Sequence, residues 1–499
     1  MTLEKAYAVY QSGTDIRGVA CEGVAGEPVN LTDDKIMQFA DGFLLWLCDK
    51  TGKKADALTV AVGHDSRISA ERIQNAVVSR LVRAGVRVLL CGLASTPSMF
   101  QTTVELGTDG AVQITASHHP FHRNGLKFFT RDGGLDTADI RIILLHAQNG
   151  DQPQACDGGT AQPCDFMQQY AALLREKILQ EVTDPKDGKP LQGLHLVVDA
   201  GNGAGGFYAT EVLQKLGADI SGSQFLEPDG RFPNHIPNPE NEDAMRSVSE
   251  ATVRAGADLG IIFDTDVDRA GCVGPDGKEI NRNRLIALAA TIALNGRKGG
   301  VIVTDSTTSD GLHEFLQDTL GAMHHRFKRG YKNVINEAVR LCAEGKDCPL
   351  AIETSGHAAL RENYFLDDGA YLMTKIVITL VNLRAQGKAL EDCLAALKEP
   401  AEAVEKRYAI TEPDFRTYGQ QVLTALEQYA ATQPDWVIAP DNHDGIRVSV
   451  TGGWFLLRLS VHDPILPLNA ESETQGGTAQ IITEVEEFLH NFEKLAFPN

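Results

Sequence analysis

The sequence predicts an α/β protein of several domains, with a smaller α+β domain at its C-terminal end. The chain has 499 residues, enough for three or four hydrophobic cores. Apolar strand-like runs alternate with helical patterns over most of its length, which is typical of parallel sheets joined by right-handed crossovers. Near the C-terminus this alternation is replaced by paired strands and one helix.

The first elements of the alternation lie before residue 120. "ALTVAVGHD" predicts a strand and a turn, and "ISAERIQNAVVSRLVRAGV" predicts a helix that Ser69 can cap. "RVLLCG" and "GAVQITASHHP" are the next strands. The same order returns at "LHLVVDAGNGAGG", "ADLGIIFDTDVDR", "GGVIVTDSTTSDGLHEFLQDTLG" and "CPLAIETSGH".

The domain boundaries are predicted from breaks in this rhythm. Segments 147–165, 274–284 and 397–407 are rich in turn-forming or charged residues and read as loops or linkers. In the last segment, "GIRVSVTGGWFLLRLSVHDPILPLNAES" predicts paired strands and "AQIITEVEEFLHNFEKL" predicts a helix. We therefore expect three α/β domains and a C-terminal α+β domain, over residues 1–158, 159–278, 279–400 and 401–499.

Charge and composition limit the classes of partner. The formal net charge of −21 disfavours nucleic acid and anionic membranes as main partners, because phosphate groups attract basic surfaces. The N-terminus lacks an apolar leader, and runs such as "LIALAATIAL" are too short to cross a bilayer. Nine cysteines without a C-x-x-C pair suit reduced thiols. We expect a cytoplasmic protein that binds a small molecule.

The stretch "ITASHHPFHRNGLKFF" carries a candidate nucleophile directly after an apolar strand. Ser117 and His118 lie at the turn, where an exposed hydroxyl can meet backbone N–H donors and carry an anionic group. "NG" at 124–125 forms a tight turn that returns Lys127 towards the serine, where its cation can neutralise a phosphate. The alternative is a capped helix start with exposed histidines.

The stretch "FDTDVDR" predicts a divalent metal site. Its carboxylates, Asp264, Asp266 and Asp268, occupy every second position after the apolar run "LGIIF", and Arg269 follows them. Three carboxylates in one loop repel one another unless a hard cation such as Mg²⁺ binds between them. The alternative is a solvated acidic turn.

Two further loops have the chemistry of sugar and phosphate binding. In "IETSGH", Glu353 and Ser355 are two positions apart, so both can bond neighbouring sugar hydroxyls, with His357 after them. "RLSVHDP" offers a guanidinium, a hydroxyl and an imidazole for an anion. Each loop can also be an ordinary polar strand end. Cations near glycine turns complete the set: Arg17 in "TDIRG", and Arg329 and Lys332 in "KRGYKN".

Together these motifs resemble the α-D-phosphohexomutase family, and within it the phosphomannomutase/phosphoglucomutase branch. "TASHHPFHRNGLK" is similar to the family pattern T-A-S-H-N-P…N-G-x-K, and "DTDVDR" is similar to D-G-D-G-D-R. "VVDAGNGAGG", "EPDGRFPNHIPNPE" and "ETSGH" also match, so the resemblance covers nearly the whole chain. It implies four domains around a central cleft, an enzyme that is a monomer or a homodimer, and interconversion of hexose 1-phosphate and hexose 6-phosphate.

The resemblance also implies a role for each candidate residue. Ser117 would be the phosphoserine and, with the three aspartates, would hold Mg²⁺. His118 and Arg269 would line the site, and Lys127, Arg17 and His357 would assist proton transfer or stabilise charge. Glu353, Ser355, Arg329 and Lys332 would bind the sugar, whereas Arg458, Ser460 and His462 would hold the other phosphate. A hexose 1,6-bisphosphate would be both the intermediate and the activator.

Departures from the family pattern leave alternatives open. His119 replaces an asparagine, Thr265 and Val267 replace two glycines of the metal loop, and "SVHDP" replaces S-N-T-x-P. We expect the metal loop to avoid positive φ, since β-branched residues disfavour it. The alternatives are a phosphoglucosamine mutase, a haloacid-dehalogenase-type phosphatase with Asp264 as nucleophile, and a non-catalytic sugar-phosphate sensor.

Overall fold

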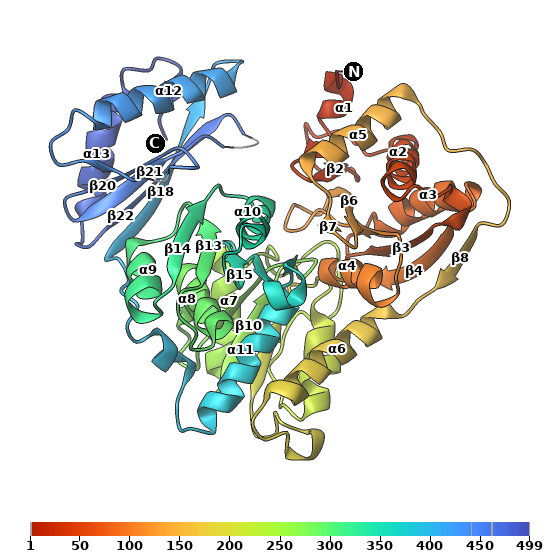
Figure 1. Ribbon diagram of the computed structural model, residues 1–499, viewed down its shortest axis with the longest axis horizontal. Coiled ribbons are helices and arrows are strands. Elements are labelled where there is room, and N and C mark those ends of the chain that lie inside the picture. Colours follow the sequence, from red (N-terminus) through yellow and green to blue (C-terminus); the bar gives the residue numbers. More distant parts are fainter. Residues whose placement is uncertain (1, 441, 461–462, 499) are drawn as a thin grey trace. The chain divides into compact units, whose positions relative to one another are not determined.

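The computed structural model describes residues 2–440, 442–460 and 463–498 (Figure 1). It divides into two compact units. The first comprises Met1–Ile292 and Ser355–Cys393, and the second comprises Ala293–Thr354 and Leu394–Asn499.

The first unit begins with an eight-stranded mixed sheet. Its order is β1-β2-β6-β5-β3-β4-β8, and β7 pairs with β6. Strands β3, β4, β5 and β8 are parallel, whereas β2 and β6 are antiparallel to their neighbours. The strands are β1 Gln11–Ser12, β2 Asp15–Val19, β3 Thr59–His64, β4 Arg87–Leu93, β5 Gly110–Ile114, β6 Arg123–Thr130, β7 Gly133–Gly134 and β8 Thr160–Pro163.

Helices cover both faces of this sheet because its strands alternate side chains between the faces. Val60 and Val62 of β3 join the core beneath the helices α2, α3 and α5, whereas Gly63 faces Met99 of α4 (Figure 1). A Cβ at Gly63 would lie 2.5 Å from the Met99 sulfur, so glycine permits the close approach of α4. The helices are α1 Lys5–Ala8, α2 Asp33–Thr51, α3 Ala70–Arg83, α4 Thr96–Glu105 and α5 Thr137–Asn149.

Two local expectations for this region need correction. Ser69 lies at the start of α3 but makes no capping hydrogen bond, because its backbone angles (φ −90°, ψ 0°) are not the extended ones of a capping residue. Its Oγ instead accepts a hydrogen bond from Asn124 Nδ2 at 2.8 Å. The segment 147–165, expected to be a loop, contains β8, which pairs with β4 and extends the sheet by one edge strand.

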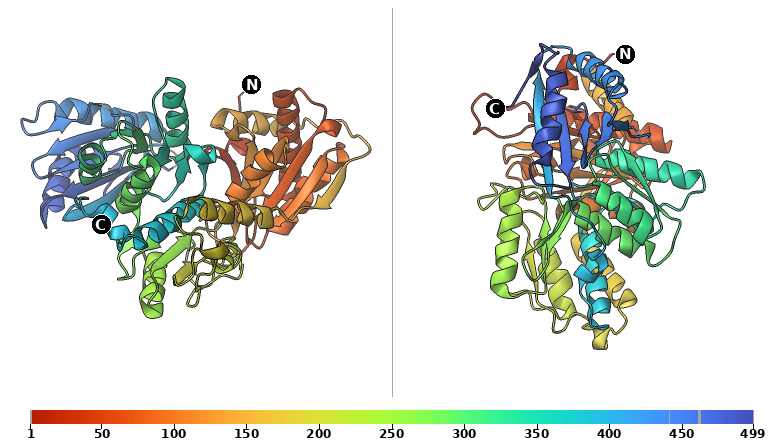
Figure 2. Two further views of the ribbon diagram at one scale, coloured as in Figure 1. Left: turned by 60° about the horizontal axis from the view of Figure 1, so that its bottom comes forward. Right: turned by 90° about the vertical axis from the view of Figure 1, so that its left-hand side faces the viewer.

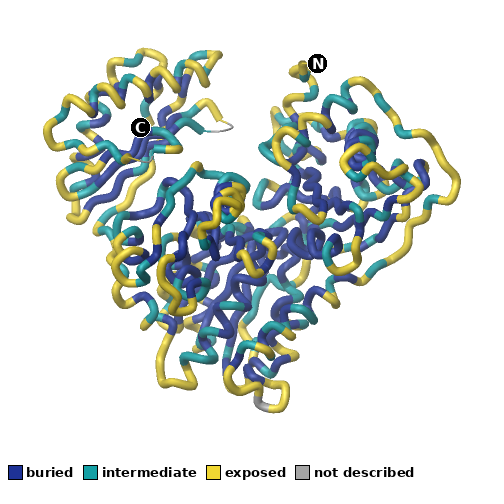
Figure 3. Tube along the Cα trace, in the orientation of Figure 1, coloured by how far each residue is buried: buried dark blue, intermediate teal, exposed yellow. Residues whose placement is uncertain are grey.

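A second, four-stranded sheet of the same unit has the order β12-β11-β10-β9. Its central strand β10 is buried throughout, as predicted from the apolar run "LGIIF" (Figure 3). Helices α6 and α11, far apart in the sequence, lie side by side and are joined by a Lys375–Glu181 ion pair of 2.6 Å (Figures 1 and 2). The elements of this region are α6 Phe166–Glu181, β9 Leu196–Asp199, α7 Glu242–Ala255, β10 Leu259–Phe263, β11 Ala270–Val273, β12 Glu279–Ile280 and α11 Gly369–Arg384. The first unit also contains β16 Ala358–Leu360 and β17 Leu366–Asp367, an antiparallel pair outside this sheet.

The second unit contains a parallel three-stranded arrangement, β14-β13-β15, and the C-terminal sheet β19-β20-β21-β22-β18-β23. Helix α8, Arg282–Leu294, reaches the start of this unit. The first group comprises β13 Val301–Asp305, α9 Asp310–Glu314, β14 Met323–Phe327, α10 Tyr331–Ala343 and β15 Leu350–Ile352. The second comprises β18 Glu402–Ile410, α12 Phe415–Ala430, β19 Val437–Ile438, β20 Ile446–Val450, β21 Gly453–Leu457, β22 Ile465–Ser472, α13 Gly477–Leu489 and β23 Leu495–Ala496.

These elements confirm the predicted fold class. Three α/β regions precede a C-terminal antiparallel sheet that packs against α12 and α13 around a core of its own. The predicted paired strands are β20, β21 and β22, and the predicted final helix is α13. Within the described residues, every helix is too short or too polar to cross a bilayer.

A buried polar cluster joins the two parts of the second unit. Arg447 on β20 binds Asp310 of α9 at 2.8 Å and lies 3.5 Å from the centre of the Trp454 ring. Trp454 Nε1 donates to Glu471 Oε2 at 2.8 Å, and Glu471 is only 8% exposed. Burial raises the pKa of Glu471 to about 7, against the lowering effects of Trp454 and Arg447.

We expect Glu471 to make stability fall as the pH rises. Between the ordinary glutamate pKa and about pH 7, Glu471 keeps its proton in the folded protein but loses it in the unfolded chain. The stabilisation that is present below the ordinary pKa is therefore lost as the pH rises through this range. When the pH is raised from about 5 to about 8, the unfolding free energy of Glu471→Gln should increase by about 2 to 3 kcal/mol relative to that of wild type. Urea unfolding of both proteins measures this difference. The control is Glu473→Gln, because Glu473 is exposed. The prediction would be contradicted if the unfolding free energies of wild type and Glu471→Gln differed by the same amount at both pH values.

Candidate active site

The predicted nucleophile and the predicted metal loop meet in the first unit. Ser117 follows β5, and the loop from Asp264 to Arg269 joins β10 to β11. Ser117 Oγ donates to Asp264 Oδ2 at 3.1 Å and accepts from Arg269 Nη2 at 3.0 Å. His118 Nδ1 lies 3.3 Å from the same oxygen and also contacts Arg269 Nη2. Residues 147 positions apart thus surround one hydroxyl.

The three aspartates form a group that suits a divalent cation. One carboxylate oxygen from each of Asp264, Asp266 and Asp268 lies within 4.8 Å of the others, and all three residues are buried. Among the described residues, Asp266 Oδ1 and Asp268 Oδ1 have no hydrogen-bond partner. Buried carboxylate oxygens without donors are costly, and a hard cation with oxygen ligands would satisfy them. The donor set therefore fits Mg²⁺.

Lys127 lies on the other side of these carboxylates. Its Nζ is 3.1 Å from Asp266 Oδ2 and also contacts Asp268 Oδ2. Asn124 and Gly125 do not form the expected tight turn, because both lie within strand β6, and it is this strand that brings the lysine to the metal loop. Thr96, at the start of α4, donates its hydroxyl to Asp266 Oδ2 at 2.5 Å. These contacts occupy one oxygen of Asp266 and one of Asp268 and leave the second oxygen of each for a cation.

The charges of the site shift the pKa values of its titratable groups in different directions. The positive charge of Arg269, followed by burial, lowers the pKa of His118, so its ring is neutral and Nδ1 can accept from Arg269. Burial, together with the charges of Asp268 and Asp266, raises the pKa of Asp264. At Asp268 the cations of Lys127, His357 and Arg269 outweigh burial and lower its pKa. A bound cation would favour ionisation of all three carboxylates.

The metal loop does not avoid positive φ, contrary to our expectation. Thr265 does not have a positive φ, but Val267 has φ of 67°, and Ser117, the predicted nucleophile, has φ of 49°. The fully buried Val267 is held there because its carbonyl accepts from the amide of Gly369 at 3.0 Å, at the start of α11. A Cβ on Gly369 would lie 2.7 Å from the Arg269 carbonyl carbon, so the helix approaches too closely for another residue. Tertiary contact thus imposes a conformation that valine disfavours.

His357 and Arg17 belong to the same unit as Ser117. His357 pairs with Arg269 in an isolated antiparallel bridge, and its Nδ1 contacts Asp367 Oδ2. Burial lowers the pKa of His357, but the charges of Asp367 and Asp268 outweigh it and raise that pKa. Arg17, on β2, binds Asp15 at 2.7 Å.

The predicted sugar- and phosphate-binding residues are divided between the units. Ser355 is in the first unit, and Glu353, Arg329, Lys332, Arg458 and Ser460 are in the second. Within the second unit, Glu353 Oε1 accepts from the amide of Gly330 at 2.5 Å, which fixes the turn between Arg329 and α10. His462 lies outside the described residues.

Arg458 in the second unit has the surroundings of an anion-binding residue. It is 9% exposed, and its Nε has no hydrogen-bond partner among the described residues. Burial, followed by the positive charge of Arg329, lowers its pKa. Two guanidinium groups near each other favour an anion between them. Ser460 Oγ accepts from the amide of Asp463 at 3.3 Å.

Several residues around Ser117 were missed by the sequence reasoning. Four residues that were not predicted contact residues of the site or its loop: Thr96, Asp367, Asp65 and Arg67. The sequence does contain a pattern that indicates Asp65 and Arg67, because "GHDSR" places polar groups directly after the apolar strand β3. No comparable pattern in the sequence singles out Thr96 or Asp367.

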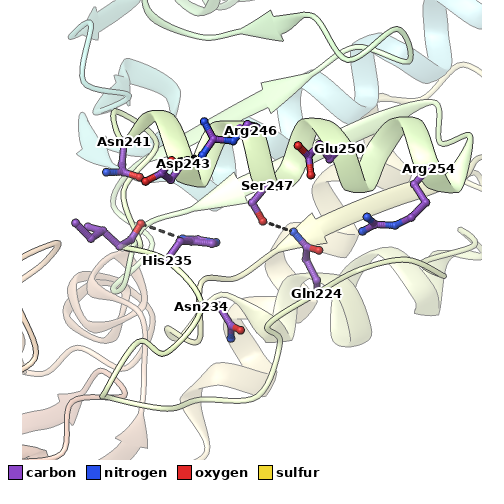
Figure 4. Close-up of a pocket in the computed structure, with 10 residues that line it drawn as sticks. Gln224, Asn234, His235, Asn241, Asp243, Arg246, Ser247, Glu250 and Arg254 are labelled. Carbon is purple, nitrogen blue, oxygen red and sulfur yellow. Dashed lines mark hydrogen bonds and ion pairs between the residues drawn. The ribbon is translucent and has the colours of Figure 1, made fainter.

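A separate hollow of about 590 Å³ lies beside α7 in the first unit (Figure 4). Its polar groups pair within the protein: His235 Nδ1 is 3.0 Å from the carbonyl of Ile236, and Gln224 Nε2 donates to Ser247 Oγ at 2.7 Å (Figure 4). None of its lining residues belongs to the predicted site.

Comparisons with known proteins show that the chain is similar to members of one enzyme family. Models described as phosphoglucomutase/phosphomannomutase alpha/beta/alpha domains I, II and III match residues 10–153, 169–277 and 281–400. A phosphomannomutase of Salmonella montevideo is 30% identical over 83% of this chain and 87% of its own length. A phosphomannomutase/phosphoglucomutase of Pseudomonas putida is 28% identical over 85% of each chain. The crystal structure of a phosphoglucomutase/phosphomannomutase family protein from Burkholderia thailandensis superposes with a TM-score of 0.80, 25% identity and 99% coverage of both chains.

Proposed function

The chain belongs to the phosphoglucomutase/phosphomannomutase family, and from this premise we propose that it interconverts hexose 1-phosphate and hexose 6-phosphate. The sugar would be mannose, glucose or both. Ser117 would carry the transferred phosphoryl group, and a hexose 1,6-bisphosphate would be the intermediate. The observation that carries this proposal is the placement of Ser117 Oγ 3.1 Å from the metal-loop residue Asp264 and 3.0 Å from Arg269.

The reaction would begin with phosphorylated Ser117. Its P–O bond to Oγ breaks as the free hydroxyl of the hexose phosphate forms a new P–O bond and loses its proton. The leaving Ser117 Oγ takes up a proton in exchange. Lys127, Arg17 and His357, whose ring is oriented by Asp367, would assist this proton transfer or stabilise the developing charge. The bisphosphate then turns, and Ser117 Oγ accepts its other phosphoryl group, which regenerates the phosphoserine.

Arg269 and His118 would hold the phosphoryl group during transfer. Arg269 Nη2 already reaches Ser117 Oγ, so its positive charge lies where charge spreads over the transferred oxygens. The neutral His118 adds a dipole without competing for the proton. Mg²⁺ held by Asp264, Asp266 and Asp268 together with the seryl phosphate would supply further neutralisation of that charge.

The remaining predicted residues would bind the substrate. Glu353 and Ser355 would bond sugar hydroxyls, and Arg329 and Lys332 would bind the sugar face or its phosphate. Arg458, Ser460 and His462 would hold the phosphate that does not react. We also propose four functional domains with the predicted boundaries, and hexose 1,6-bisphosphate as an activator that phosphorylates Ser117.

Trapping the phosphoenzyme tests the proposed function. Incubation with glucose 1,6-bisphosphate and Mg²⁺ should add one phosphoryl group, which mass spectrometry should locate at Ser117. A phosphoserine ester survives acid and hydroxylamine, whereas an acyl phosphate at Asp264, expected of a haloacid-dehalogenase-type phosphatase, is lost in hydroxylamine. A label at Asp264 would refute the mutase mechanism.

A coupled assay then identifies the sugar. Glucose, mannose and glucosamine 1-phosphates are compared at equal concentration with Mg²⁺ and the bisphosphate. We expect turnover of mannose or glucose 1-phosphate. Preferential turnover of glucosamine 1-phosphate would identify a phosphoglucosamine mutase, and no turnover of any of them would favour the non-catalytic sensor.

A further inference from the structure

Arg67 is fully enclosed beneath the loop that carries Ser117. Its guanidinium donates to backbone carbonyls rather than to side chains of that loop. Nη2 donates to the carbonyl of Ser117 and, at 2.6 Å, to that of His119; Nη1 donates to those of Pro120 at 2.9 Å and Arg123 at 2.8 Å. The Arg67 side chain is completely inaccessible to solvent. One side chain therefore fixes four carbonyls within seven residues.

The same guanidinium is connected to the backbone amide of Ser117. Arg67 Nε is 3.2 Å from Asp65 Oδ2, which accepts from the hydroxyl of Thr115 at 2.7 Å. That hydroxyl accepts from the amide of Ser117 at 2.8 Å. The amide and the carbonyl of Ser117 are thus both held, directly or through two residues, by Arg67.

A loop of the second sheet region covers this arginine. The ring of Phe232 lies 5.2 Å from the Arg67 guanidinium carbon, within the range of a cation–π contact. At Gly230 an added Cβ would lie 2.6 Å from Arg67 Cα, so only glycine permits this approach. Both residues belong to "EPDGRFPNH", a segment that the proposed reaction does not use.

We propose that Arg67 is the positioning residue that holds Ser117 Oγ in line for phosphoryl transfer. The inference rests on the proposed role of Ser117. Arg67 contacts backbone groups of the loop, so it acts through Ser117 and does not take part in the chemistry itself. The segment around Gly230 and Phe232 keeps water away from it.

The backbone of Ser117 explains why such a clamp is needed. At φ of 49° a serine is in a sparsely populated conformation that persists only when its surroundings hold it. Without the bonds to its carbonyl and amide, the loop would relax towards ordinary angles and move Oγ away from Asp264 and Arg269. A displacement of about 1 Å can reduce phosphoryl transfer by about 10²-fold.

The test compares Arg67→Lys with wild type. Lysine keeps the charge opposite Asp65 but lacks the planar fork that reaches four carbonyls. We measure the rate of Ser117 phosphorylation by glucose 1,6-bisphosphate, kcat and KM, and amide hydrogen exchange over residues 117–123. The matched control is Arg175→Lys, since Arg175 Nη1 on α6 also donates to a backbone carbonyl, that of Glu211 at 2.6 Å, in a different part of the first unit.

We expect Arg67→Lys to lower the phosphorylation rate and kcat by about 10²-fold with little change in KM, and to speed exchange in the loop. Arg175→Lys should leave these quantities unchanged. Phosphorylation within about threefold of wild type in a folded Arg67→Lys protein would overturn the inference. If wild type takes up no phosphoryl group, the proposed function fails, and loop exchange still reports whether Arg67 orders the loop.

A pair of variants at Thr115 decides the question if Arg67→Lys does not fold. Thr115→Ser keeps the hydroxyl between Asp65 and the Ser117 amide, whereas Thr115→Val removes it at nearly constant volume. Slow phosphorylation in Thr115→Val and a rate near wild type in Thr115→Ser would support the inference. Equal rates in both variants and wild type would overturn it.

Discussion

Replacing Ser117 with alanine is expected to reduce mutase turnover by at least about 10⁴-fold, because the group that accepts and returns the phosphoryl moiety is removed. The change deletes one buried oxygen that contacts Asp264 and Arg269 and leaves the carbonyl and amide bonds of the loop in place. The fold should therefore persist, with a thermal midpoint close to that of wild type. The coupled assay measures turnover, and mass spectrometry measures phosphoenzyme.

Ser79→Ala is the matched control for this loss. Ser79 is exposed on α3, and its hydroxyl donates only to the Ala76 carbonyl of its own helix among the described residues. It should retain full turnover. Retained interconversion in Ser117→Ala would refute the phosphoserine mechanism, and a phosphoryl group on Asp264 in that variant would identify the aspartate as the nucleophile.

Asp268→Asn is expected to weaken Mg²⁺ binding and to reduce kcat/KM by about 10³-fold. Asp268 supplies one of the two metal-loop carboxylate oxygens that have no donor among the described residues, and its other oxygen contacts Lys127. The amide removes a negative charge from the cation site and weakens the ion pair that holds Lys127. Titration calorimetry with Mg²⁺ measures the first effect and the coupled assay the second.

The control for this variant is Asp276→Asn in the same sheet region. Asp276 is exposed in a turn and accepts from the amide of Lys278 at 3.0 Å, so the substitution changes the net charge equally without touching the metal loop. Its Mg²⁺ affinity and turnover should match wild type. Unchanged Mg²⁺ affinity in Asp268→Asn would show that the three aspartates do not bind the metal. Addition of a chelator should abolish turnover of the wild type.

The sequence by itself determined the fold class, the family and the identity of the central groups. Periodicity identified strands such as β10 and helices such as α13, because burial imposes a spacing that one sequence can reveal. Ser117, Lys127 and the three aspartates were recognised because each follows a strand or returns beside one. The predicted boundaries and the roles of individual residues remain predictions.

Only the tertiary structure decided which groups hold the site in shape. Three such interactions depend on contacts between distant segments or on loop geometry, which periodicity does not encode. They are the hydrogen bonds of Arg67 to four carbonyls, that of the Thr96 hydroxyl to Asp266, and the pairing of His357 with Asp367. The left-handed angles at Val267 show the same limit, since valine alone disfavours them and contact with α11 imposes them. Local patterns specify which residue types are available, whereas three-dimensional packing decides which of them meet and in what conformation.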